Sequence, residues 1–127
     1  MTRDISIILP AKNEAESLQQ LLPALREQFP DEEILVVNDG STDSTVEVCE
    51  QQGITVISHV YSMGNGAAIK TGARNATKSI LIFMDADGQH TPADITRLLD
   101  KLDEGYDMVV GARLLDSHAS LTRRIGN

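Results

Sequence analysis

Two aspartates follow a short apolar segment in a pattern that favours metal binding. Leu81–Met84 is continuously apolar, which is typical of a strand buried on both faces. Asp85 and Asp87 cannot continue such a strand, because an unpaired buried charge is too costly. If the backbone stays extended there, alternate side chains face the same way, so the two carboxylates converge on one spot. Paired oxygen ligands suit Mg²⁺ or Mn²⁺, especially when phosphate oxygens share the ion.

The same aspartates also have a plainer interpretation. Aspartate is a common turn former, and small Ala86 and permissive Gly88 suit the boundary between a strand and a turn. A bare Asp-x-Asp pattern is too short to separate a metal site from a turn, so the surrounding chain has to decide.

The elements that must position these acids are alternating strands and helices. Short apolar runs bounded by turn residues predict strands, and apolar residues at helical spacing predict helices between them. Strands are expected at 5–9, 34–37, 55–58, 79–84 and 108–110. Helices are expected between Asn13 and Pro30, between Ser44 and Gly53, from the glycine-rich turn at 63–68 to Ala76, and from Thr91 to about Glu104.

Capping residues locate the helix ends. Asn13 with Glu16, and Ser44 with Glu47, match the capping-box pattern of a helix start. Gly53 is a fitting residue just past a helix end.

Prolines and leucines refine the first strand and the first helix. Pro10 is expected to stop the first strand, and Pro23 to kink or divide the first helix. One apolar stripe should face the core of that helix, made of Leu18, Leu21, Leu22 and Leu25.

This alternation predicts an α/β fold, with three α/β/α layers around a mostly parallel sheet. A length of 127 residues fits one domain. In such sheets ligands bind at the carboxyl ends of the strands. The polar groups cluster at those ends: Asn13, Glu14, Asp39, Asp85, Asp87 and Arg113.

Composition excludes several classes of partner. A net charge of −8 argues against nucleic acid, which is bound by basic surfaces. Aromatic residues make up 3% and tryptophan is absent, so there are no stacking platforms for single strands. No signal peptide or membrane-spanning run is visible, which makes the cytoplasm the expected location. Cys49 is expected to be a reduced, packed thiol, and His59 and His118 to be surface residues.

Three motifs together resemble family 2 glycosyltransferases of the GT-A fold. These are Ile8–Glu14, Val36–Asp43 and Met84–His90, and their order and intervals also match. Asn65–Ala68 and Gly111–Arg113 fit the branch that transfers sugars to polyprenyl (dolichyl-type) phosphates. Any one motif would be weak, but the ordered set spans essentially the whole chain.

The resemblance implies a role for each site residue. Pro10, Ala11, Asn13, Glu14 and Ala86 would belong to the nucleotide-sugar site, and Asp39 would accept hydrogen bonds from uracil or guanine. Asp85 and Asp87 would hold Mg²⁺ or Mn²⁺ on the donor pyrophosphate and offset charge on the leaving diphosphate. Gln89 would contact the sugar or the acceptor phosphate, and Arg113 would pair with a phosphate. Asp87, Gln89 and Arg113 are the expected catalytic residues.

Plainer alternatives stay open for several of these residues. Asp39 could form an Asx turn before Gly40, Gln89 could be a solvated loop residue, and Arg113 could lie on the surface.

Family members have a longer catalytic domain than this chain, which stops at Asn127. We therefore expect a nucleotide-sugar-binding domain over 1–127 that is the N-terminal part of a longer, truncated catalytic domain. The expected reaction is inverting transfer from a UDP- or GDP-sugar to a lipid phosphate. Transfer to a saccharide hydroxyl, or sugar-nucleotide binding without turnover, are the alternatives. Peripheral membrane association and a homodimer are further expectations.

Overall fold

The computed structural model describes residues 4–87, 92–103, 106–109 and 121–123. Its centre is a four-stranded, fully parallel sheet in the order β3-β2-β1-β4. The strands are β1 (Ile5–Ala11), β2 (Glu33–Asn38), β3 (Thr55–Ser58) and β4 (Ile80–Phe83). The helices are α1 (Ala15–Gln28), α2 (Thr45–Gln51), α3 (Asn65–Asn75) and α4 (Pro92–Asp103).

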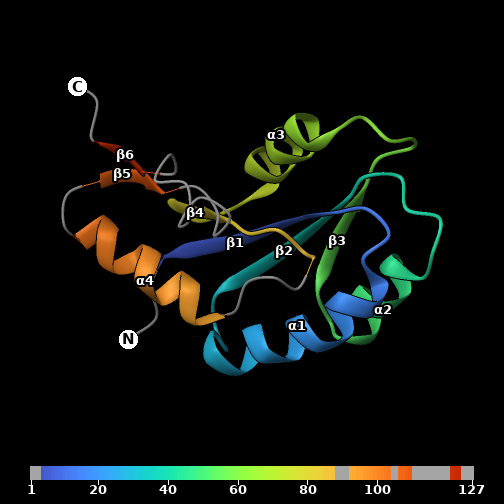
Figure 1. Cartoon of the computed structure of the whole chain (residues 1–127), viewed down its shortest axis with the longest axis horizontal. Helices are drawn as coiled ribbons and strands as arrows, with labels where there is room; N and C mark the ends of the chain where they lie inside the picture. The colour runs from blue at the N-terminus through green and yellow to red at the C-terminus, as the bar shows by residue number, and fades with distance from the viewer. Residues whose placement is uncertain (1–3, 88–91, 104–105, 110–120, 124–127) are drawn as a thin grey trace.

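Helices cover both faces of this sheet. α1, α2 and α4 lie on one face and α3 on the other (Figure 1). The larger apolar cluster joins the predicted leucine stripe of α1 to Ile95 and Leu99 of α4 and to alternate residues of β1. The smaller cluster packs Ala68 of α3 against Ile8, Leu35 and Val37. The three-layer α/β/α arrangement and its parallel sheet are therefore confirmed.

The expected fifth strand does not join the parallel sheet. β5 (Tyr106–Val109) pairs antiparallel with β6 (Leu121–Arg123) in a separate two-stranded sheet. β6 was not among the expected strands, because three residues are too few to show a strand period.

Pro10 does not end the first strand, which continues to Ala11 beside Asn38 of β2. Ile8 accepts a hydrogen bond from the backbone of Met84, and Pro10 faces the same side two residues later. Proline has no N–H to donate toward β4, whose last paired residue is Phe83. Pro10 therefore cannot continue the pairing with β4, and the chain beyond Met84 leads to the pocket described below.

The helix ends agree with the sequence in part. Ser44 is the N-cap of α2, but its side chain makes no capping hydrogen bond, so the predicted capping box was wrong. Gly53 follows the C-cap with a φ of 70°, as expected. Pro23 lies inside α1 without dividing it, on an exposed face where the carbonyl it leaves unpaired can reach water.

Cys49 is buried, and burial followed by the charge of Glu50 raises the pKa of its thiol to about 11. None of the described helices is long and apolar enough to cross a bilayer.

Candidate functional site

A pocket of about 480 Å³ opens at the carboxyl ends of the strands. Residues from the loops after β1, β2 and β4, and from the chain at the start of α3, line this pocket. Its lining residues are Pro10, Ala11, Lys12, Glu14, Asp39, Ser62, Gly64, Asn65, Ala68, Asp85, Ala86 and Asp87.

Seven of the residues predicted from the sequence line this one pocket. They come from segments far apart in the chain: Pro10, Ala11, Glu14, Asp39, Asp85, Ala86 and Asp87. Asn13 is not among the lining residues, and Gln89 and Arg113 lie outside the described residues.

Asn13 joins two loops and does not cap α1. Its φ is 56°, and its side-chain oxygen accepts hydrogen bonds from the backbone of Thr42 at 2.7 Å and of Asp43 at 3.2 Å. Its own N–H donates to Ser41 Oγ at 2.8 Å. The predicted cap was wrong because a partner about thirty residues away in sequence outcompetes the local one.

The start of α1 is capped by the loop after β2. Asp43 accepts a hydrogen bond from the N–H of Ala15 at 3.2 Å, and Thr45 Oγ1 accepts one from the N–H of Glu14 at 3.1 Å. Asp43 also accepts from the N–H of Thr45, the first residue of α2, at 2.9 Å. One carboxylate thus serves the N-termini of two helices, where negative charge is favourable.

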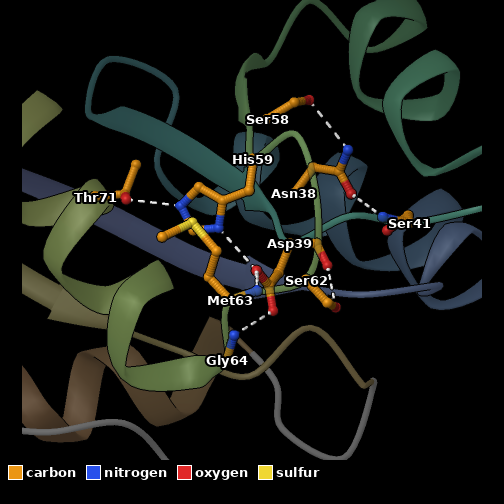
Figure 2. A network of polar contacts seen from close by, with 9 residues as sticks. All are labelled: Asn38, Asp39, Ser41, Ser58, His59, Ser62, Met63, Gly64 and Thr71. Atoms are coloured by element: carbon orange, nitrogen blue, oxygen red, sulfur yellow. Dashed lines mark hydrogen bonds and ion pairs between the residues drawn. The ribbon is translucent and has the colours of Figure 1, made fainter.

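Asp39 is held by donors from the chain between β3 and α3. Its Oδ1 accepts from His59 Nδ1 at 2.8 Å and from the N–H of Met63 at 2.7 Å (Figure 2). Its Oδ2 accepts from the N–H of Gly64 at 3.0 Å. Burial disfavours the charge, but the donors of His59, Met63 and Gly64 outweigh burial and hold the pKa of Asp39 below its ordinary value.

His59 is not the surface residue that the sequence suggested. Its side chain is 8% exposed, and its Nε2 lies 2.7 Å from Thr71 Oγ1 of α3 while its Nδ1 meets Asp39. Both partners are distant in sequence, so no local pattern around His59 could have revealed them.

Acids that follow β1 and β4 line the same pocket. The pKa of Glu14 is raised, first by burial and then by the negative charges of Asp87, Asp43 and Asp85. Glu14, Asp85 and Asp87 all line the pocket, so a cation bound there would relieve their mutual repulsion.

These acids fit a divalent ion shared with a ligand. Within the described ranges, no group of three or more metal-ligand side chains is arranged to hold a metal ion by itself. Mg²⁺ is commonly bound by one or two carboxylates and completed by substrate phosphates, which is what Asp85 and Asp87 could offer.

Sequence reasoning gave no role to several lining residues. Lys12 is the one basic side chain among the lining residues. Its positive charge within the first motif could have indicated a place in the site. Gly64, Asn65 and Ala68 belong to the glycine-rich turn that supported the resemblance. Ser62 carries no signal, because the fold of its loop alone brings it to the pocket.

Comparison with known proteins gives a consistent picture. The family described as glycosyl transferase family 2 matches residues 6–125. Polyprenol monophosphomannose synthase of Mycolicibacterium smegmatis is 35% identical over 121 residues, covering 88% of this chain and 46% of that protein. Glycosyltransferase AglJ of Haloferax volcanii is 35% identical over 128 residues, covering 97% of this chain and 41% of that protein. The chain therefore spans about half the length of these relatives, or less.

A solved structure has the same fold. Glucosyl-3-phosphoglycerate synthase from Mycobacterium tuberculosis, in complex with Mn²⁺ and UDP-glucose, matches with a TM-score of 0.69 and 27% identity. The match covers 79% of this chain and 39% of that one.

Proposed function

This chain belongs to glycosyltransferase family 2, and from that premise we propose that it forms the donor-binding part of a metal-dependent sugar transferase. The donor is a UDP- or GDP-sugar, the acceptor is a polyprenyl (dolichyl-type) phosphate, and transfer proceeds with inversion. Residues 1–127 are then the N-terminal, nucleotide-sugar-binding part of a longer catalytic domain.

One observation carries this proposal. Three motifs separated in sequence converge on one pocket, whose lining includes Asp39, held by three internal donors, and Glu14, whose pKa is raised partly by the charges of Asp87 and Asp85. The first region suits a base and the second a cation with its diphosphate. A divalent metal held by Asp85 and Asp87 would offset the charge that develops on the leaving diphosphate. Lys12 adds a positive charge at the same pocket.

The acceptor is supported by the name of a relative and by chemistry. The Mycolicibacterium relative is a polyprenol monophosphomannose synthase. A phosphate acceptor is already ionised at neutral pH, so its oxygen can attack without a strong general base. A lipid acceptor places the reaction at a membrane surface, and we propose peripheral association with its cytoplasmic face. A homodimer stays a prediction.

Calorimetry of nucleotide binding tests the metal site. UDP and GDP should bind in the presence of Mn²⁺ or Mg²⁺, and EDTA should abolish most of the affinity. Asp87→Ala should remove both the affinity and its metal dependence, because a ligand to the ion is lost. Asp100→Ala, at an exposed position of α4, is the matched control and should bind like the unchanged chain. Equal binding with EDTA and with Mn²⁺ would refute the metal site.

Product analysis tests the acceptor. The full-length parent protein should glycosylate a polyprenyl phosphate and not an oligosaccharide. Transfer to the oligosaccharide would favour a saccharide hydroxyl as acceptor, and tight donor binding without any product would favour a binding module.

A further inference from the structure

The acceptor capacity of Asp39 is nearly exhausted by the protein. A carboxylate offers about four lone-pair positions, two on each oxygen. Two donors already occupy Oδ1, from His59 Nδ1 and the N–H of Met63, and one occupies Oδ2, from the N–H of Gly64. About one acceptor position is left, and it lies on Oδ2.

The carboxylate is also fixed in this orientation. His59 is held from its other side by Thr71 Oγ1, at 2.7 Å from Nε2 (Figure 2). Ser62 Oγ donates to the carbonyl of Asp39 at 2.8 Å, and the N–H of Asp39 donates to the carbonyl of Ala11 at 2.8 Å. Rotation of the side chain would break three charge-assisted hydrogen bonds, so the free position keeps its place.

Asp39 is nevertheless within reach of a ligand in the pocket. The side chain of Asp39 is only 10% exposed, and Asp39 is part of the pocket lining. His59, Met63 and Gly64 already donate to the carboxylate, so a base that reaches Asp39 meets the one acceptor position that is left.

Resting on the proposed function, we infer that the pocket selects a base that presents a single N–H to Asp39, and that the donor is a UDP-sugar. Uracil has one ring N–H between two carbonyl oxygens. Guanine presents a ring N–H and an amino group side by side, which need two acceptor positions on the two carboxylate oxygens. With Oδ1 filled, one of the guanine donors would be desolvated without a partner. His59 is then a positioning residue that determines specificity by occupying Oδ1.

The test compares UDP and GDP binding by calorimetry with Mn²⁺, for the unchanged chain and two variants at His59. The unchanged chain should bind UDP at least about tenfold more tightly than GDP, the loss expected for one unpaired donor. His59→Leu removes the donor to Oδ1 and should narrow this ratio toward one. His59→Asn places an amide N–H close to where Nδ1 stood and should restore the ratio.

The possible outcomes separate a role of His59 in specificity from a role in packing alone. A purely packing role for His59 would weaken both nucleotides alike and leave the ratio unchanged in His59→Leu, which would overturn its part in specificity. GDP bound as tightly as UDP by the unchanged chain would overturn the inference even if the variants fail to fold, while metal-dependent binding would leave the proposed function standing. No binding of either nucleotide would overturn the proposed function, and this inference with it.

Discussion

The loops after β2 and β4 each bring two aspartates to one edge of the sheet, yet their surroundings are opposite. In the loop after β2, Asp39 and Asp43 accept hydrogen bonds from the protein, and the pKa of each carboxyl is lowered although burial opposes this. In the loop after β4, Asp85 and Asp87 stand close enough to Glu14 that their charges, together with that of Asp43, add to burial in raising the pKa of Glu14.

The two loops differ in whether the hydrogen bonds to their acids or the repulsion between acids is the prominent feature. Asp39 and Asp43 accept hydrogen bonds from internal donors and hold loops and helix ends in place. Acids that repel one another favour a bound cation, which makes them suited to a metal and its diphosphate. Identical residue types thus meet different surroundings at one edge of the sheet.

The sharpest way to disturb the loop after β2 is Gly40→Ala. Gly40 has a φ of 74°, and an added Cβ would lie 2.6 Å from the backbone nitrogen of Ser62. Left-handed strain and the clash together should lower the free energy of unfolding by about 2–5 kcal/mol. Gly53→Ala is the control, since φ is 70° but no atom lies within 4 Å, so about 1 kcal/mol is expected. Urea denaturation measures both, and equal losses would show that the close approach to Ser62 is unimportant.

Replacing one acid from each loop should separate their roles. Asp43→Ala removes acceptors from the N–H groups of Ala15 and Thr45 at two helix starts, which should cost about 1–4 kcal/mol of stability. Asp85→Asn should cost less stability than Asp43→Ala without metal, because it also relieves repulsion of Glu14. Thermal or urea unfolding in EDTA measures the pair. The comparison fails if Asp85→Asn is the more destabilising change.

The smallest effect concerns pH. Asp39 and Asp43 have folded pKa values below 3.8, so the unfolded chain binds protons more readily, and their stabilisation is lost as pH falls below about 4. Glu14 has the opposite sign, since its folded pKa is above 4.5 and its ionisation lowers stability as pH rises through that range. Solvent screening keeps the second effect below about 1 kcal/mol.

Unfolding followed between about pH 3 and pH 7 in EDTA checks these signs. Glu14→Gln should abolish the small decline in the free energy of unfolding as pH rises above about 4.5. It should leave unchanged the loss of stability at pH values below about 4. A steeper decline in Glu14→Gln than in the unchanged chain would contradict the crowding of acids in this pocket.

Local patterns in the sequence were sufficient for the main elements. β3 coincides with the expected strand at 55–58, and the leucine stripe of α1 is buried as its spacing predicts. Strands alternating with helices imply a parallel sheet, and a parallel sheet places all its carboxyl ends together. The sequence therefore determined that Glu14, Asp39, Asp85 and Asp87 would share one edge.

Tertiary structure alone decided what those residues contact. His59 meets Asp39 across twenty positions of sequence, and Asn13 meets Thr42 across twenty-nine. Periodicity and capping rules describe neighbours within about one helical turn, so they cannot anticipate partners that only folding brings together. Which donors reach an aspartate depends on such distant partners, and that is why the sequence placed these residues at one edge of the sheet while only the fold decided what each of them contacts.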